Sequence, residues 1–290
     1  MVVLNRFVWW EMRPHQWTKN LLVYAALLFG GGLFAENNLL LVTMVFGAFC
    51  LVSSGVYFFN DISDVEKDRQ NPKKCNRPIA AGKITMRQAY IWTVFLWLGG
   101  GVLAYMVNGN CFRLSAAYVV MNICYTLRLK HVVIIDVMII AVGFLLRAVM
   151  GAVAIGMDMT VWFLLCVMFL SIFLALGKRR HELVAVEENS ITKGRKVLQF
   201  YSIDLIDQLM TISATALLIC YALFTVDANT RNHEIMTYTV PVAIYGVFYY
   251  LYIVRVKKGG GAPDESLYKE KPILVVVLLY IASIIVIRNF

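Results

Sequence analysis

The sequence predicts an all-α membrane protein with nine transmembrane helices and a cytoplasmic N-terminus. Of its 290 residues, 60% are hydrophobic and only 16% are charged, and the mean hydropathy is +0.69. A soluble domain of this length would carry charge on about a quarter of its residues. We therefore expect residues 1–290 to form a single integral membrane domain that crosses the bilayer many times.

Nine apolar runs are the candidate transmembrane helices. A helix needs about 20 residues to cross the hydrocarbon, so the first, fourth, sixth and ninth runs are short and need independent support. The runs are 21–34, 39–59, 89–107, 114–127, 132–157, 161–176, 209–226, 236–254 and 273–287.

The distribution of Lys and Arg supplies that support. With nine spans, the N-terminus and the loops after spans two, four, six and eight share one side, which holds all but four of the 27 basic residues. The exceptions are Arg113, Arg231 and Arg288 on the opposite side and Arg147 within a span. Basic loops face the cytoplasm. We therefore predict a multi-pass protein of the plasma or inner membrane with its functional loops in the cytoplasm.

The cytoplasmic loops are expected over residues 60–88, 177–208 and 255–272, and residues 1–20 are expected to form a retained interfacial helix rather than a signal peptide. The net charge of +9 belongs to these segments and forms no compact basic domain, so nucleic-acid binding is not expected. The six cysteines contain no CxxC pair, which argues against structural zinc and a disulfide framework.

The segment FFNDISDVEKDRQNP, residues 58–72, places acidic residues at the end of an apolar run. If this helix continues past the membrane edge, Asp61, Asp64 and Asp68 share one face, with Asn60 beside them and Glu66 pointing elsewhere. Carboxylates so placed repel one another unless a cation binds, and oxygen ligands suit Mg²⁺ that bridges to substrate phosphates. The alternative is a solvated helix end that neighbouring Lys and Arg residues neutralise.

These residues resemble a known family signature. Asn60-Asp61-x-x-Asp64-x-x-x-Asp68 is similar to the NDxxDxxxD motif of the UbiA superfamily of intramembrane prenyltransferases, and Arg77 lies in a following N-R-P-I segment that is also similar. The resemblance implies a UbiA-type bundle of nine helices. It also implies that the three aspartates bind Mg²⁺ and a donor diphosphate, with Asn60 and Arg77 contacting substrate.

Further motifs resemble one branch of this family, the decaprenyl-phosphate phosphoribosyltransferases. They are RPHQWTKN at 13–20, YTLRLK at 125–130 and LGKRRHE at 176–182. The aromatic prenyltransferases instead carry a second DxxxD motif after the sixth span, where this chain has a basic cluster. Beyond the first motif, the resemblance implies further site residues of two kinds. The catalytic ones are Lys178, Arg179 and Asp207. The substrate-binding ones are Lys19, Tyr125, Lys130, Asp136, Arg180 and Glu182.

A phosphorylated sugar donor would explain the basic cluster. Phosphoribosyl diphosphate carries a 5-phosphate besides its diphosphate, and a polyprenyl phosphate acceptor carries a phosphate of its own. Lys178, Arg179 and Arg180 are placed to bind these groups, because Arg offers bidentate contacts and Lys a point charge. The alternative for this trio is a basic anchor at a helix end.

Arg147 is expected to face the protein interior, because an arginine at the bilayer centre costs at least about 2.5 kcal/mol. It follows Asp136 by eleven residues, about three turns, and so lies on the same helix face. We interpret this face as the lining of the active cavity, which makes Arg147 a candidate substrate-binding residue. The alternative is a structural contact between helices.

The residues and the resemblance together predict a Mg²⁺-dependent enzyme. It would transfer a 5-phosphoribosyl group from phosphoribosyl diphosphate to a decaprenyl-like polyprenyl phosphate in the bilayer and release diphosphate. One alternative is prenyl transfer from a prenyl diphosphate to an aromatic or other small acceptor. A distant alternative is a divalent-cation transporter, against which the acidic residues gather at one surface rather than along a path.

Overall fold

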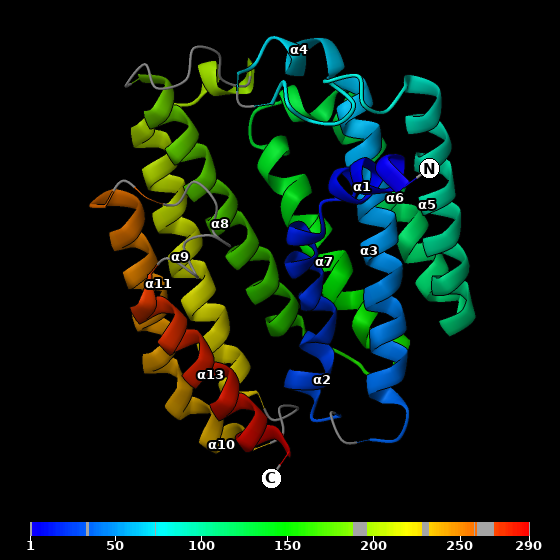
Figure 1. The fold of residues 1–290 in the computed structure, drawn as a ribbon. Helices are drawn as coiled ribbons and strands as arrows, with labels where there is room; N and C mark the ends of the chain where they lie inside the picture. Colours follow the sequence, from blue (N-terminus) through cyan, green and yellow to red (C-terminus); the bar gives the residue numbers. More distant parts are fainter. Residues whose placement is uncertain are drawn as a thin grey trace.

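The computed structural model describes residues 2–32, 35–72, 74–187, 196–227, 232–257, 259 and 270–289, and every element in these ranges is helical. Long helices form a bundle, and short helices join them (Figure 1). The elements are α1 (Val2–Glu11), η1 (Pro14–Tyr24), α2 (Ala25–Gly30), α3 (Asn38–Ser63), α4 (Val65–Arg69), α5 (Met86–Val107), α6 (Gly109–Leu127), η2 (Leu129–His131), α7 (Ile135–Ala154), α8 (Val161–Glu187), η3 (Lys196–Phe200), α9 (Ile203–Val226), α10 (His233–Met236), η4 (Thr237–Thr239), α11 (Val240–Arg255) and α13 (Lys271–Asn289).

Seven helical segments in the described chain are long and apolar enough to cross a membrane, so this is a multi-pass membrane protein. The predicted runs 21–34 and 114–127 fall outside this set. The first corresponds to η1 followed by α2, which has only six residues, and the second to α6, which is 19 residues long but less apolar. The seven are Asn38–Ser63, Met86–Val107, Ile135–Ala154, Val161–Glu187, Ile203–Val226, Glu234–Arg255 and Lys271–Arg288.

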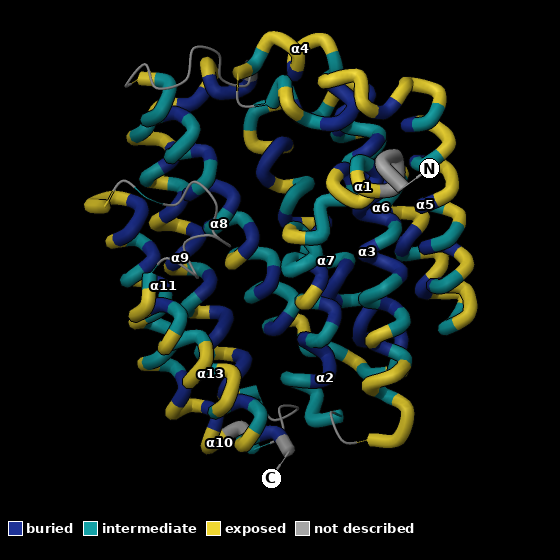
Figure 2. Tube along the Cα trace, in the orientation of Figure 1, coloured by how far each residue is buried: buried dark blue, intermediate teal, exposed yellow. Residues whose placement is uncertain are grey.

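The helices pack one after another around a ring. Helix α3 packs against α5, α5 against α6, α6 against α7 and α7 against α8, and the order continues through α9, α11 and α13. Helix α13 packs against α2, which closes the ring beside α7 (Figure 1). Buried residues line the inner helices α3 and α7, whereas α5 exposes a long row of residues (Figure 2). Exposed apolar side chains on α5, such as Leu98 and Tyr105, suit a surface that contacts lipid.

Two close helix contacts depend on glycine. A Cβ at Gly151 in α7 would lie 1.9 Å from the carbonyl oxygen of Val23 in η1. A Cβ at Gly100 in α5 would lie 2.8 Å from the carbonyl oxygen of Ala48 in α3. Small residues let helix backbones approach closely in a membrane. Gly151 therefore fixes the position of η1, which leads from α1 into the bundle.

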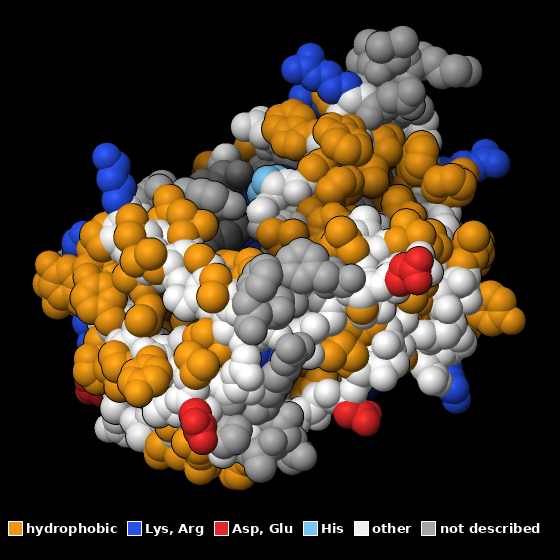
Figure 3. Space-filling model, turned by 90° about the horizontal axis from the view of Figure 1, so that it is seen from below, with side chains coloured by type: hydrophobic (Ala, Val, Ile, Leu, Met, Phe, Trp, Pro, Cys, Tyr) orange, Lys and Arg blue, Asp and Glu red, His pale blue; other side chains and the backbone are white. Residues whose placement is uncertain are grey.

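Polar elements gather at one end of the bundle, called the α4 end here. The end of α3, helix α4, the connection from α6 to α7 and the end of α8 all lie there (Figure 1). Among its described residues, the opposite end shows mostly hydrophobic side chains and uncharged surface, with a few acidic side chains and with Lys and Arg at the edge of the view (Figure 3). A site that binds a charged substrate is therefore expected at the α4 end.

Helix α8 is longer than the sequence indicated. The predicted cytoplasmic loop over residues 177–208 begins as helix, because α8 continues to Glu187. The basic residues Lys178, Arg179 and Arg180 therefore stand on a helix rather than in a loop. Their directions are fixed by the helical period, so adjacent members of the trio point to different neighbours.

Gly151→Ala is expected to destabilise the fold. The added methyl group would overlap the Val23 carbonyl group, which only backbone movement can relieve, and such overpacking costs about 1–3 kcal/mol. The apparent melting temperature of the purified protein in detergent measures the effect. Gly109→Ala is the matched control, since nothing lies within 4 Å of a Cβ there. Equal melting temperatures for the two variants would contradict the close contact.

Candidate active site

The acidic segment bends at Asp64. Helix α3 ends immediately before this residue and α4 begins immediately after it, and its φ is −103° and its ψ 7°. The Asp64 N–H still donates to the Asn60 carbonyl group, and the Asp68 N–H donates to the Asp64 carbonyl group. The continuous helix expected from the sequence is therefore bent. As a result, Asp61 and Asp68 share one partner, whereas Asp64 has another.

Asp61 and Asp68 share a cationic group. The Nη1 atom of Arg77 lies 3.0 Å from Oδ1 of Asp61 and 2.6 Å from Oδ2 of Asp68. Both aspartates are buried, at 2% and 3% exposed, and breaking such buried ion pairs is costly. Arg13 also donates to Asp61, and Nζ of Lys74 lies 3.7 Å from Asp68. The two carboxylates thus surround a position that a cation already occupies.

Arg13 reaches Asp61 from an uncommon backbone conformation. Its φ of 54° and ψ of 61° lie in the left-handed region, which residues other than glycine rarely adopt. Pro14 follows and begins η1, and the guanidinium lies 5.1 Å from the centre of the Tyr57 ring. This turn directs Arg13 toward the acidic segment. Sequence reasoning did not assign Arg13 to the site, although its place in RPHQWTKN was an available signal.

Asp64 pairs with Lys130 from η2. The Nζ atom of Lys130 lies 2.8 Å from both carboxylate oxygens, and Lys67 lies 3.6 Å away. Burial raises the pKa of Asp64, but the hydrogen bond from Lys130 and the charges of Lys130, Lys67 and Lys74 outweigh it, so the net pKa is below its usual value. The ion pair joins the bend of the acidic segment to the connection between α6 and α7.

A second polar cluster lies where α8 meets the start of α7 and η3. The Nε atom of Arg179 lies 2.7 Å from Asp136, and its Nη1 lies 2.9 Å from Glu182. The Tyr201 hydroxyl donates to Asp136 and accepts from the Ile134 N–H, both at 2.8 Å. Ile134 has a φ of 68°, which is strained for a β-branched residue. The network therefore holds a strained turn at the start of α7.

One nitrogen of Arg179 has no hydrogen-bond partner in the described part of the chain. Its Nη2 atom is buried and donates to no acceptor among the described residues, although Tyr125 is close enough to act on its charge. Buried polar groups are nearly always hydrogen-bonded. Since Asp136 and Glu182 fix the direction of the guanidinium, Nη2 is a positioned donor that an anionic ligand could use.

Arg180 and Asp207 form a junction between α8, α9 and α11. The Nε atom of Arg180 lies 2.8 Å from Asp207, and its Nη1 donates to the Val254 carbonyl group at 3.0 Å. Arg255 lies 3.5 Å from the same carboxylate. Lys178, on the same helix, is half-buried. Asp207 therefore ties three helices together.

Arg147 lies inside the bundle and bonds to uncharged groups. Its guanidinium nitrogens donate to Oδ1 of Asn20, the Gly143 carbonyl group and the Tyr118 hydroxyl, at 2.7–2.8 Å. Asp136, predicted on the same face, instead pairs with Arg179. These contacts match the alternative of a structural contact between helices. A role for Arg147 in substrate binding stays a prediction.

Lys19 and Asn60 are both half-buried, and Asn60 contacts an aspartate of the acidic segment. Lys19 donates to Gln16 in η1, and Nδ2 of Asn60 lies 3.4 Å from Asp61. Of the residues predicted for the site, the structure thus brings Asn60, Asp61, Asp68 and Arg77 together. It joins Asp64 to Lys130, and places Asp136, Arg179, Glu182 and Tyr125 in the second cluster.

Glu11 is a buried acid that sequence reasoning missed. It ends α1, is 2% exposed, and its oxygens have no hydrogen-bond donor in the described chain. The Asp61 carboxyl group lies at hydrogen-bonding distance. Burial and then this contact raise the pKa of Glu11 to about 8, while Arg13 and Arg77 act in the opposite direction. One signal was available: Glu11 is the only acid in the first 35 residues.

The donor set of this cluster fits Mg²⁺ as a pair of carboxylates. The described His, Cys, Asp and Glu side chains form no group of three or more that could hold an ion as they stand. Asp61 and Asp68, however, both lie within 3.0 Å of one Arg77 nitrogen. Mg²⁺ usually keeps several waters and takes one or two carboxylates. The pair therefore suits this ion once the Arg77 guanidinium moves aside.

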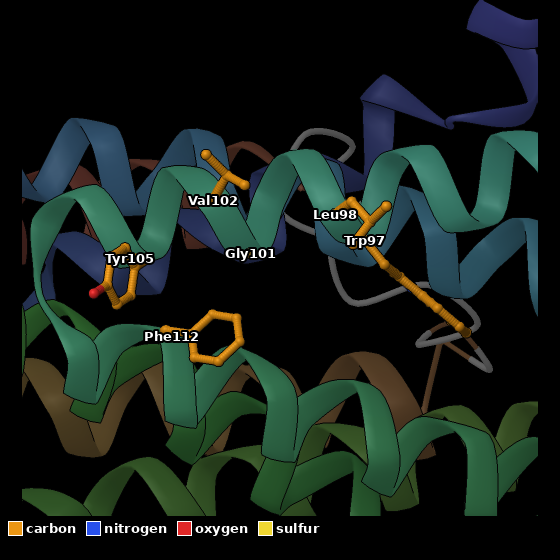
Figure 4. Close-up of a pocket in the computed structure, with 6 residues that line it drawn as sticks. All are labelled: Trp97, Leu98, Gly101, Val102, Tyr105 and Phe112. Atoms are coloured by element: carbon orange, nitrogen blue, oxygen red, sulfur yellow. The ribbon is translucent and has the colours of Figure 1, made fainter.

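An apolar groove lies between α5 and α6 on the outward side of the ring. The rings of Tyr105 and Phe112 lie at one end of it, and Trp97 lies at the other (Figure 4). The groove contains no charged side chain, so it supplies nothing for phosphate chemistry. Its lining residues are Trp97, Leu98, Gly101, Val102, Tyr105 and Phe112.

Similarity to known proteins defines the class. The UbiA prenyltransferase family matches residues 20–268. A decaprenyl-phosphate phosphoribosyltransferase of Mycolicibacterium smegmatis is 35% identical over 286 residues, which cover 94% of this chain and 89% of that protein. One of Corynebacterium glutamicum is 34% identical over 94% of this chain and 84% of that protein. The chain belongs to the UbiA prenyltransferase family, which confirms the family predicted from the motifs.

Solved structures agree on the fold. A UbiA homolog from Archaeoglobus fulgidus bound to GPP and Mg²⁺ has a TM-score of 0.72 to this chain at 16% identity, with 96% of this chain and 98% of that one covered. A digeranylgeranylglyceryl phosphate synthase has a TM-score of 0.68 at 18% identity, with 100% and 99% covered. The all-helical UbiA fold is thereby confirmed.

Glu11→Gln is expected to make the stability of the metal-free protein less dependent on pH. The folded pKa of about 8 lies above the ordinary value of 4.5. The stabilising contribution of the protonated carboxyl group is therefore complete below the ordinary value and is lost as the pH rises through the folded pKa. Between these values, the melting temperature of the wild type in chelator should fall relative to that of the variant. Parallel curves of melting temperature against pH would contradict the buried acid pair.

Proposed function

We propose that this protein transfers a 5-phosphoribosyl group from phosphoribosyl diphosphate to a polyprenyl phosphate and releases diphosphate. The observation that carries the proposal is the pair of buried carboxylates, Asp61 and Asp68, around one cation position beside Arg13, Arg77 and Lys74. Carboxylates can hold a metal there, while the basic groups can bind phosphates. Relatives named decaprenyl-phosphate phosphoribosyltransferase, 33–35% identical over 94% of the chain, support this donor and acceptor.

The chemistry requires charge stabilisation more than a strong base. The lipid phosphate oxygen is already an anion and can attack the anomeric carbon of the ribose as the bond to diphosphate breaks. Positive charge then grows on the sugar and negative charge on the leaving diphosphate, which fixed cationic groups stabilise. Mg²⁺ bound by Asp61 and Asp68 would supply positive charge to that diphosphate. Arg77, once it leaves the two carboxylates, can bind donor phosphates.

The third predicted metal ligand, Asp64, pairs with Lys130 rather than with Arg77. Its carboxylate contacts Lys130, so it would join a metal only when that ion pair opens. Until then Asp64 orients Lys130 at the α4 end. Opening of the pair would free Lys130 for a phosphate at the same moment that Asp64 turns to the metal.

The second cluster can contact the donor from α8. The Nη2 atom of Arg179 is the donor that we propose for a substrate phosphate, because Asp136 and Glu182 already hold the other two nitrogens. Lys178 and Arg180 stay predicted members of this basic group. Asp207 then acts by positioning Arg180.

We propose that the chain spans the plasma or inner membrane nine times, with the N-terminus and the α4 end in the cytoplasm. The concentration of Lys and Arg in segments on that side supports this orientation. The two additional spans would be η1 with α2, and α6, since both pack within the ring of helices. The polyprenyl tail would lie against apolar helix faces.

Incorporation of radiolabelled phosphoribosyl diphosphate into lipid tests the proposed reaction. Membranes that contain the wild-type protein and a polyprenyl phosphate should form a labelled lipid. Asp61→Asn and Asp64→Asn should each lower the rate by about 100-fold or more, the scale seen when one group that stabilises transition-state charge is removed. Glu66→Gln is the matched control, because Glu66 is exposed and its ion pair in the described chain is with Arg69 at the surface.

The same assay separates the alternatives. Failure to label any polyprenyl phosphate would contradict the proposal, and a prenylated aromatic product formed from a prenyl diphosphate would establish the first alternative in its place. Flux of Mg²⁺ into proteoliposomes without turnover would favour a transporter.

A further inference from the structure

We infer that Glu11 is a further carboxylate of the divalent-cation site, contributed by the N-terminal helix α1. A cation bound at Asp61 would then also hold α1 against the bundle. The inference rests on the proposed function, because it takes a metal at Asp61 as its starting point.

Glu11 occupies a position that disfavours a negative charge. It is 2% exposed and neither of its oxygens has a hydrogen-bond donor in the described chain. Burial of a polar group without a partner is unfavourable, and burial of a charge more so. Glu11 is also the last residue of α1, where the helix dipole favours cations rather than anions. A purely structural residue here would be apolar or an amide, so the carboxyl group points to a role that needs negative charge.

Contacts on both sides fix where Glu11 lies. Val8, about one turn earlier in α1, is buried in the apolar cluster at the end of α3. Immediately after Glu11, the Met12 carbonyl group accepts a hydrogen bond from the Ser54 hydroxyl at 3.0 Å. The Trp17 indole donates to the same hydroxyl at 3.1 Å. The end of α1 is therefore held on α3, and Glu11 is held at the Asp61 carboxyl group.

Two adjacent carboxyl groups need a shared proton or a cation between them. Arg13 and Arg77 are the nearby cations, but both donate to Asp61, and neither donates to Glu11. The Glu11 oxygens thus lie beside the Asp61 carboxyl group and receive no hydrogen bond from a basic side chain among the described residues. Carboxylate oxygens are the ligands that Mg²⁺ and Mn²⁺ take in proteins.

The Arg77 guanidinium occupies the position where the acidic groups would bind a metal ion together. It lies between Asp61 and Asp68, with its Nη1 atom 3.0 and 2.6 Å from their carboxylates. Its withdrawal would leave the two aspartates and Glu11 with fewer positive charges than negative ones. A divalent cation would restore the balance and would draw on ligands from α1, α3 and α4. Metal binding and the docking of α1 are coupled in this arrangement.

Mn²⁺ binding to the purified full-length protein, followed by electron paramagnetic resonance, tests the inference without any turnover. Glu11→Gln should bind Mn²⁺ at least about 10-fold more weakly, the lower end of the loss seen when groups around a metal are removed. Glu66→Gln, at an exposed surface pair, should keep the wild-type affinity. Hydrogen exchange should show metal-dependent protection of α1 in the wild type and in Glu66→Gln, but not in Glu11→Gln.

Glu11→Asp separates a ligand from a packing residue. Asp keeps the charge but is shorter, whereas Gln keeps the shape but is neutral. A ligand role predicts that Glu11→Asp retains more Mn²⁺ affinity than Glu11→Gln, and a packing role predicts the reverse order.

Asp61→Asn distinguishes failure of this inference from failure of the proposed site. Wild-type affinity in Glu11→Gln together with weakened binding in Asp61→Asn would overturn the inference and leave the proposed function intact. Unchanged affinity in both variants would overturn the inference together with the metal site on which the proposed function relies.

Discussion

The shared cation between two buried carboxylates organises the α4 end of this protein. Asp61 and Asp68 are almost fully buried, and a single Arg77 nitrogen lies against both. Buried carboxylates need positive charge nearby, because an unpaired buried charge is costly. The bend at Asp64, the turn that directs Arg13 and the burial of Glu11 all place charged groups around this pair. This arrangement suits the binding of phosphate esters, because a metal ion and basic side chains are both positively charged and both bind negatively charged phosphate groups.

The ring of helices explains how these charges can exist in a membrane protein. Charged side chains are expensive inside the hydrocarbon, so they gather where helices end and bond to one another. Lys130 on η2 and Arg179 on α8 each form an ion pair with a carboxylate from another element. Arg147 is the internal exception, and three uncharged groups bond to it. The ion pairs therefore connect both sides of the ring at the end where we propose that the donor binds.

Local sequence patterns predicted the helical membrane fold and the aspartate motif, because apolar runs and charge spacing along one helix are local properties. The extension of α8 to Glu187 was missed, since its polar residues resemble a loop until packing shows that Arg179 is buried and its neighbours Lys178 and Arg180 are half-buried. Contacts between residues that are far apart in the chain could not be predicted from local sequence patterns. Arg13 and Glu11 lie about 50 positions from Asp61, and only the fold of the turn after α1 brings them to it.

Our central claim is that the gap between Asp61 and Asp68 is a cation site in which the Arg77 guanidinium and a divalent metal are alternatives. The most direct measurement is the Mn²⁺ affinity of Arg77→Gln in the absence of donor. The account predicts tighter metal binding than in the wild type, because the competing cation is gone, together with weaker binding of phosphoribosyl diphosphate. Unchanged or weaker Mn²⁺ binding in Arg77→Gln would contradict it.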